Sequence, residues 1–216
     1  MLADQVKERI LEGILTGRHP LDSRLVETQV ARELGTSQAP VREALRGLEA
    51  LGVVEITPFR GARVRRPTRR EILEAYVVRS TLEALAARLA VPRLTGDDLA
   101  ALQAELEAMR AAARDDDGRG LAEADARFHG RIVTVADNLA LEKTWRALEP
   151  FSRTYLTLVV PGADPDWSAE LHAPIMAALE RREPDAVVEA LERHFDEARH
   201  NMARRWPAEA VTDRDP

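Results

Sequence analysis

Apolar residues recur at helical spacing along the N-terminal part of the chain, and glycines interrupt the pattern. A first helix is predicted over about residues 2–16, and a short second helix ends at Gly35. A third helix begins after the capping residues Thr36 and Ser37 and ends at Gly52. The apolar residues that define these helices are Val6, Ile10, Ile14, Leu15, Val30, Ala31, Leu34, Val41, Ala44, Leu45 and Leu48. The pattern predicts two short helices joined by a tight turn, preceded by a supporting helix.

After Gly52 the pattern changes to that of short strands. Residues 53–56 are β-rich, residues 58–61 contain Pro and Gly and turn the chain, and residues 62–65 return. Four arginines lie around the tip and the second strand of this small hairpin, namely Arg60, Arg63, Arg65 and Arg66. Helices followed by a basic hairpin make a winged helix-turn-helix, which we place at residues 1–67.

Pro67 is the expected hinge, because proline biases its neighbour away from helix. Beyond it no segment has the pattern of a strand. Helical spacing continues to Pro92, then from Thr95 to Met109 and over later stretches at about 121–136, 167–181 and 184–205. A further helix begins after Asn138, and we expect Pro150 to kink or split it before Pro161 and Gly162 stop it. The sequence therefore predicts a mainly α protein, in which the winged helix-turn-helix with its small β-hairpin is followed by an all-α bundle of six or seven helices at residues 71–205. We expect the polar residues 206–216 to form a disordered tail.

Composition excludes several classes of protein. Of the 216 residues, 45% are hydrophobic and 31% are charged, a balance that supports a packed core. The absence of Cys excludes disulfides and metal sites built on sulfur. No segment approaches the roughly 20 apolar residues of a membrane span, and the N-terminus lacks a signal-peptide pattern. We expect a cytoplasmic protein with no membrane partner.

Positive charge is concentrated at the N-terminal end, although the formal net charge of the whole chain is −6. Residues 1–70 hold 13 Lys and Arg against 9 Asp and Glu, which gives +4. Residues 71–216 hold 18 against 28, which gives −10. A basic module on an acidic body concentrates affinity for phosphate in one place. This distribution favours double-stranded DNA as the partner of residues 1–67.

The third helix carries the side chains that we expect to read DNA. An α-helix fits the major groove, where Arg42 can contact a guanine through two hydrogen bonds and Gln38 can contact an adenine. Arg46 points outward from the same helix, and Ser37 and Thr28 are placed for phosphates. The wing residues Arg60, Gly61 and Arg63 complete the expected DNA-binding set. The alternative interpretation is that these are ordinary solvated charges on a small helical domain.

Histidines in the bundle indicate a metal site. Asp125 and His129 are four residues apart on one predicted helix and share a face. His172 and His194 lie on the last two predicted helices. Three imidazoles and a carboxylate could bind a divalent transition metal, with Zn favoured and Ni, Fe or Mn possible. The alternative is that each is a core or surface histidine without a ligand.

Residues 25–64, LVETQVARELGTSQAPVREALRGLEALGVVEITPFRGARV, resemble the DNA-binding domain of the GntR family. The motifs P-V-R-E-A-L, L-x-x-L-G and R-G-A-R-V carry the resemblance. It implies that Arg42 contacts a base and that Gly61 approaches the minor groove. The family commonly has Arg at the position of Gln38, so we expect the preferred operator to differ at that contact.

Residues 71–205 resemble the FCD ligand-binding domain of the FadR-type branch of this family. The matching motifs are R-S-T-L-E-A-L-A-A-R-L-A, A-D-A-R-F-H, L-H-A-P-I and E-R-H-F. The resemblance implies that Asp125, His129, His172 and His194 are metal ligands. It also implies that Arg79 faces an effector cavity, where a guanidinium beside a metal would bind a carboxylate. Tyr76 and Asn201 are further candidates for that cavity, and the alternative role of Arg79 is a surface ion pair with Glu83.

These features predict a DNA-binding transcription regulator and not an enzyme. A homodimer is expected, because one helix-turn-helix reads a half-site and a palindromic operator mirrors protein symmetry. A small organic acid bound near the metal would alter operator affinity, and repression is the family's commoner behaviour. Three alternatives stay open: the metal ion is itself the signal, the metal is structural, or it activates water in an enzyme.

Overall fold

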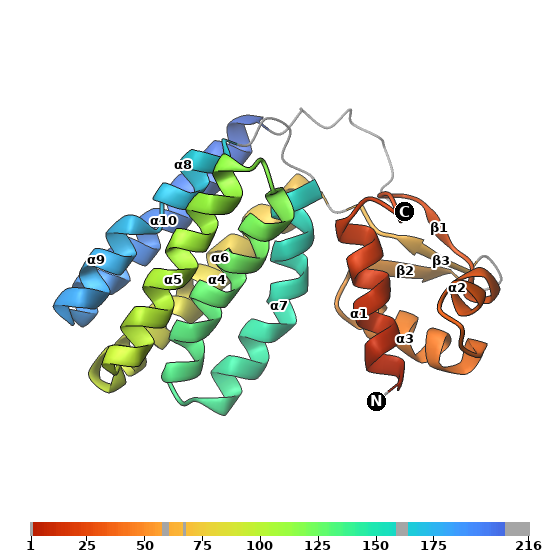
Figure 1. Cartoon of the computed structure of the whole chain (residues 1–216), viewed down its shortest axis with the longest axis horizontal. Helices are drawn as coiled ribbons and strands as arrows, with labels where there is room; N and C mark the ends of the chain where they lie inside the picture. Colours follow the sequence, from red (N-terminus) through yellow and green to blue (C-terminus); the bar gives the residue numbers. More distant parts are fainter. Residues whose placement is uncertain (1, 58–60, 67, 159–163, 206–216) are drawn as a thin grey trace. The chain divides into compact units, whose positions relative to one another are not determined.

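The computed structural model describes residues 2–57, 61–66, 68–158 and 164–205, apart from the side chains of Leu15 and of residues 149–158. The chain forms two compact units, one made of residues 1–67 with 146–158 and the other of residues 68–145 with 159–216. Figure 1 labels the elements of both units. The expected hinge at Pro67 and the expected tail at residues 206–216 lie outside the described residues.

The first unit is built on three helices, α1 (Leu2–Leu15), α2 (Glu27–Glu33) and α3 (Gln38–Ala50). Helix α1 packs against α3, and their apolar faces share one core with the sheet. Gly35 has a φ of +63° in the turn between α2 and α3, a conformation that costs little only without a Cβ. The turn places α3 with its apolar face in the core and its polar face outward, as the sequence predicts.

A three-stranded antiparallel sheet completes this unit. Strands β2 (Val54–Thr57) and β3 (Gly61–Val64) form the predicted hairpin. A short strand, β1 (Arg24–Leu25), adds to the other edge of β3, and the strand order is β1-β3-β2. This third strand was not predicted, because two residues are too few to show an alternating pattern.

The second unit is helical throughout the residues described. It contains α4 (Arg69–Ala90), α5 (Gly96–Arg114), α6 (Gly118–Val135), the first part of α7 (Leu139–Leu158), α8 (Pro165–Glu170), α9 (Ala173–Arg181) and α10 (Pro184–Arg205), with the short 3-10 helix η1 (Val91–Arg93) after α4. Thr68 and Thr95 begin α4 and α5 with capping boxes. Helix α4 packs against both α6 and α10, and α5 packs against α6 (Figure 1). The predicted fold class is confirmed.

One predicted helix is in fact two. The stretch from Trp167 to Arg181 was expected to be continuous, but α8 ends at Glu170 and α9 begins at Ala173. Pro174 cannot donate a hydrogen bond to the carbonyl of Glu170, and it fits well in the first turn of a new helix. The break places His172 at the junction as the N-terminal cap residue of α9. Pro150, in contrast, does not end α7.

None of the helices in the described ranges is long and apolar enough to cross a membrane.

Candidate functional site

The predicted DNA contacts on α2 and α3 all lie at the surface of the first unit. Thr28 and Ser37 are exposed, and Gln38, Arg42 and Arg46 follow one another at intervals of four residues along α3. This spacing puts the three long side chains on one helix face. On β3, Gly61 and Arg63 are also exposed. We call these seven residues the reading surface; Arg60 lies outside the described residues.

Arg42 is held by an acidic side chain that the sequence pattern did not single out. Its Nη2 lies 2.9 Å from Oε2 of Glu27, the first residue of α2, and its Nε donates to the same oxygen at 3.1 Å. The side chain of Arg42 is 55% exposed. The pair therefore fixes one edge of the guanidinium and leaves the other edge accessible. The motif spacing alone could not find it, because the two residues are on different helices.

Arg63 on β3 sits between two charges in the sheet register. It pairs with Arg24 on β1 and with Glu55 on β2. Like charges opposite each other in a sheet are destabilising unless an anion joins them. Gly61 has a φ of +84°, which suits glycine, and the Arg24 guanidinium lies nearby, 3.7 Å from where a Cβ would be. Arg24 thus adds a positive charge beside Arg63 and Gly61 that sequence reasoning missed.

The second unit brings together the four predicted metal ligands. Asp125 and His129 come from α6, His172 from the junction of α8 and α9, and His194 from α10. One ligand atom from each lies within 4.8 Å of the others. Their exposed fractions are 9% for Asp125, 0% for His129, 2% for His172 and 6% for His194. We call these four residues the histidine centre.

Hydrogen bonds fix the tautomers of two of the imidazoles. Nδ1 of His129 contacts the carboxylate of Glu83 and donates to it. Nδ1 of His172 donates to the carbonyls of Ser168 and Ala169, at 3.1 and 3.2 Å, near the end of α8. Both Nε2 atoms therefore carry lone pairs, yet they face each other at 3.1 Å.

The remaining two side chains add donors to the same point. Oδ1 of Asp125 lies 3.1 Å from Nε2 of His172. Nδ1 of His194 is buried and has no hydrogen-bond partner among the described residues. Such convergence of unpaired electron donors is unfavourable in a protein interior unless a cation joins them. The donor set fits a divalent transition metal of the kind that imidazole and carboxylate bind.

Electrostatics keep the centre in the form that a metal needs. Burial, followed by the neighbouring His172 and His129, lowers the pKa of His194 well below its ordinary value. Burial raises the pKa of Asp125, but the neighbouring His129, His172 and Arg79 outweigh it and lower that pKa overall. His194 is therefore a neutral imidazole and Asp125 an ionised carboxylate, and these are the forms that bind a metal.

Arg79 and Glu83 form an ion pair, as one of the two interpretations held, but the pair is buried and not at the surface. Nε of Arg79 lies 2.7 Å from Oε1 of Glu83, and its Nη2 lies 3.6 Å from Oδ2 of Asp125. The guanidinium also lies 5.2 Å from the ring of Phe195 and 5.8 Å from that of Trp145. Arg79 thus borders the histidine centre through Asp125. Glu83, which sequence reasoning missed, connects Arg79 to His129.

The other two predicted effector residues differ in position. Tyr76 is buried one turn before Arg79 and packs edge-on against Phe195, at 6.0 Å between ring centres. Burial raises the pKa of its hydroxyl. Asn201 is half-buried on α10, seven residues after His194, and no described contact joins it to the histidine centre.

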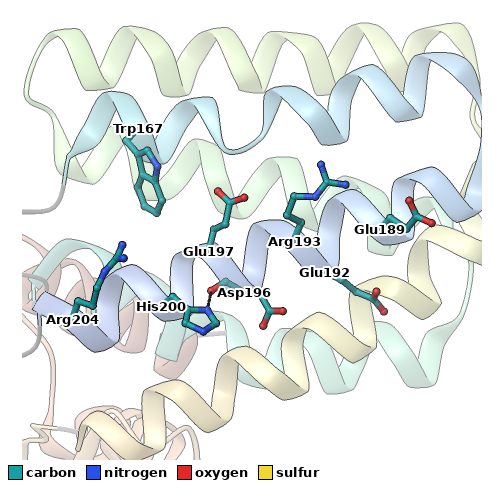
Figure 2. Close-up of a pocket in the computed structure, with 8 residues that line it drawn as sticks. All are labelled: Trp167, Glu189, Glu192, Arg193, Asp196, Glu197, His200 and Arg204. Atoms are coloured by element: carbon teal, nitrogen blue, oxygen red, sulfur yellow. Dashed lines mark hydrogen bonds between the residues drawn. The ribbon is translucent and has the colours of Figure 1, made fainter.

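A separate groove of about 700 Å³ lies along α10. Figure 2 shows its lining, in which Trp167 faces a row of charged side chains of both signs. Nδ1 of His200 donates to the backbone carbonyl of Asp196 at 2.6 Å, so this histidine is already satisfied. The groove contains none of the four residues of the histidine centre, and its exposed charges are those of a solvated helix face.

Comparisons with known proteins divide the chain into two matched parts. The family model for bacterial regulatory proteins of the gntR family matches residues 2–64, and the FCD domain model matches residues 74–197. The "Probable D-xylose utilization operon transcriptional repressor" of Paenarthrobacter nicotinovorans is 38% identical over 193 residues, which cover 89% of this chain and 85% of that protein. The HTH-type transcriptional repressor RspR of Escherichia coli is 27% identical over 177 residues, covering 80% and 76%.

A solved structure has the same fold. Escherichia coli McbR/YncC is similar with a TM-score of 0.83 at 24% identity, over 94% of this chain and 98% of that one. This likeness concerns the fold alone, whereas the family models concern the sequence. Because the FCD model covers more than half of the chain and the gntR model covers the N-terminal unit's helices and strands, the chain belongs to the gntR family of bacterial regulatory proteins and is a DNA-binding transcriptional regulator, not an enzyme.

Proposed function

We propose that this regulator is a repressor whose operator affinity changes when a small carboxylate binds at a divalent metal held by the histidine centre. The observation that carries the metal proposal is the pair of Nε2 lone pairs of His129 and His172, which face each other at 3.1 Å beside Oδ1 of Asp125. His194 supplies the fourth donor. We favour Zn, with Ni, Fe or Mn as alternatives, because imidazole-rich sites select these ions over Ca or Mg.

The charges around the centre support a carboxylate as the effector. A metal binds the neutral form of an imidazole, so in the metal-binding form Arg79 contributes +1, Glu83 and Asp125 contribute −1 each, and the buried group carries −1. A divalent ion changes this to +1. A single carboxylate then neutralises the buried group, and burying an uncompensated charge is costly. Four protein ligands leave coordination positions for such an anion when the metal prefers five or six ligands.

On the DNA side, we propose that α3 enters the major groove with Arg42 directed to a guanine. Glu27 occupies the Nε–Nη2 edge of the guanidinium, which leaves the Nη1–Nη2 edge to make two bonds to a base. Gln38 would read a neighbouring base, Gly61 would approach the minor groove, and Thr28, Ser37, Arg46 and Arg63 would contact the DNA backbone. Such a protein acts in the cytoplasm, where its operators are.

The operator would be palindromic and the protein a homodimer, as is typical of gntR regulators. Helix α4 offers a surface for the second copy, since Val77, Val78 and Leu85 are large apolar residues with about half of each exposed. Val78 and Leu85 are seven residues apart and so lie on one helix face. Light scattering on Val78→Glu, beside the wild type, tests this: a Val78→Glu protein that remains dimeric contradicts α4 as the interface.

Repression is proposed from the printed names of the relatives. Both the Paenarthrobacter and the Escherichia coli proteins are named transcriptional repressors. An effector that binds the free form more tightly than the DNA-bound form would release the operator.

The test combines metal analysis with operator binding. Purified protein is assayed for bound metal, screened with small carboxylates by thermal shift, and then titrated onto operator DNA with and without the carboxylates that raise the melting temperature. We expect about one metal per chain and at least one carboxylate that weakens operator binding. Protein without bound metal, and with no affinity for added Zn or Ni, would refute the metal centre. Metal-loaded protein whose operator binding ignores every carboxylate would refute the effector.

A second candidate has an observation in its favour. Arg79 is already paired with Glu83 and Asp125, and all four ligand side chains are buried, so Arg79 is not free to receive an acid. This arrangement suits a regulator in which the divalent ion is itself the signal. Operator affinity that tracks added metal and ignores organic acids would favour it over the carboxylate proposal.

A further inference from the structure

The carboxylate of Glu83 has three partners, and one of them, Trp145, comes from helix α7, which holds no metal ligand. Glu83 is fully buried on α4. Its Oε2 contacts Nδ1 of His129, and its Oε1 accepts from Nε of Arg79 at 2.7 Å and from the indole Nε1 of Trp145 at 2.8 Å. A buried carboxylate needs such partners, and removing one leaves a charge that is less well satisfied. The position of Glu83 therefore depends on Trp145 as well as on Arg79.

Glu83 determines which nitrogen of His129 can bind a metal. A histidine that donates one ring N–H to a carboxylate has the other nitrogen fixed in direction and made more basic. Here the bond to Nδ1 leaves Nε2 facing His172 and Asp125. Any shift of Glu83 would rotate the imidazole away from that point.

The side chain of Trp145 is packed closely beside Glu83 and His129. Its side chain is 3% exposed on the part of α7 that belongs to the second unit. The indole lies against α6 at Gly130, the residue after His129, where an added Cβ would stand 3.2 Å from its Cη2. The ring thus touches α6 beside one ligand and bonds to the carboxylate that orients the same ligand.

We propose that Trp145 is a positioning residue for the metal centre and that it links helix α7 to occupancy of that centre, through Glu83 and His129. The proposal rests on the metal centre put forward above. When His129 binds a metal, Glu83 must hold its imidazole in one orientation, and the indole that shares the carboxylate is held with it. Loss of the metal would leave the facing lone pairs of His129 and His172 uncompensated, and this repulsion would favour movement of the ring, Glu83 and the indole.

The test uses the full-length protein, stripped of metal by a chelator and titrated with Co²⁺ and with Zn²⁺. The variant is Trp145→Phe, which keeps an aromatic ring but loses the N–H donor. The matched control is Trp167→Phe, which removes an indole that lines the groove on α10. Affinity is measured by competition with a chromophoric chelator, the Co²⁺ absorption spectrum reports ligand geometry, and tryptophan emission reports the indoles.

We expect Trp145→Phe to weaken metal binding on the order of 10-fold and to alter the Co²⁺ spectrum, in line with the loss of an outer hydrogen bond to a metal ligand. The change in emission on metal binding should persist in Trp167→Phe and disappear in Trp145→Phe. Glu83→Gln should weaken metal binding at least as much as Trp145→Phe, because it disturbs the bond to His129 directly.

Each contrary outcome has one meaning. Wild-type affinity and an unchanged Co²⁺ spectrum in Trp145→Phe, even with a lower melting temperature, would show that the indole only fills space and would overturn the proposal. The same holds if Glu83→Gln weakens binding and Trp145→Phe does not. If wild-type protein binds neither ion, the metal centre itself fails, and this result is distinct from a failure of Trp145 alone.

Discussion

On the reading surface, Arg42 is 55% exposed and pairs with Glu27, whereas at the histidine centre Arg79 is 5% exposed and lies between Glu83 and Asp125. The first guanidinium keeps an accessible edge for a partner outside the protein. The second is enclosed by carboxylates and aromatic rings. The difference teaches that an exposed arginine stays available to an outside partner, whereas a buried arginine balances internal charge.

Helix α4 repeats this contrast within a single element. Arg70 and Glu74 form a pair four residues apart with an N–O distance of 2.7 Å, and so do Arg79 and Glu83. The first pair is exposed and the second is buried. Exposed pairs contribute little to stability, while a buried charge that loses its partner is strongly destabilising.

The largest effect is expected from Glu83→Ala. The change leaves Arg79 without its closest partner in the interior and removes the acceptor for His129 and Trp145. It should lower the free energy of unfolding by about 3–5 kcal/mol, measured by urea denaturation. The matched control Glu74→Ala, on the same helix at the same spacing, should leave the denaturation midpoint unchanged. Equal midpoints for the two variants would contradict the contrast between buried and exposed pairs.

Removal of metal is expected to destabilise the protein next most strongly. If the histidine centre binds a metal at about 100 times its Kd, binding stabilises the folded state by roughly 3 kcal/mol. A chelator should then lower the melting temperature by roughly 5–10 °C for a chain of this size. The variant His172→Ala should lack this response, whereas His200→Ala, outside the centre, should retain it. A chelator response in His172→Ala would show that the metal binds elsewhere.

Arg42→Ala should separate DNA binding from stability. Because the side chain is exposed, the melting temperature should stay at the wild-type value. Operator affinity should fall on the order of 10- to 100-fold, measured by fluorescence anisotropy at fixed salt, as expected for loss of a two-bond contact to guanine. Nonspecific DNA should lose much less affinity. A uniform loss on all DNA sequences would instead assign Arg42 to a phosphate.

Gln38→Arg should change which operator bases are preferred more than it changes the affinity for operator DNA. The family's common Arg favours guanine, whereas Gln favours adenine. Operator selection with both proteins should differ at one base pair in each half-site. The same preferred bases from both proteins would mean that Gln38 does not read DNA.

The smallest effect is expected from Arg63→Ala on the wing. Loss of one phosphate contact should reduce the slope of log affinity against log salt by about 1, with no change in preferred bases. Glu55→Gln, at the neighbouring register position, removes a negative charge and should not reduce that slope. A wing that reads bases would instead change the selected sequence.

These comparisons also explain what could be predicted from the sequence. Periodicity predicted most helices of both units and the hairpin. The family motifs predicted that Asp125, His129, His172 and His194 come together. Glu83 could not be identified in this way, because Arg70–Glu74 and Arg79–Glu83 have the same spacing and only tertiary packing buries one of them. The pair of Glu27 and Arg42 was missed for a related reason, since fifteen residues and a turn separate its members.

Two errors of detail have local causes. Strand β1 is too short for a pattern and exists because β3 offers it an edge. The split between α8 and α9 could have been predicted, because Pro174 was visible in the sequence and prolines favour the first turn of a helix. The consequence of the split for His172 could not be predicted, because Nδ1 of His172 reaches the carbonyls of Ser168 and Ala169 only where α8 ends.

The donor set of the histidine centre has a consequence for how the protein responds to oxidants. Its four side chains are imidazoles and a carboxylate, and the chain contains no Cys. Thiolate centres lose their metal when sulfur is oxidised, whereas these donors have no comparable oxidation steps. Peroxide or diamide should therefore leave the ligands intact, and a regulator built in this way keeps reporting the same signal while the redox state of the cell changes.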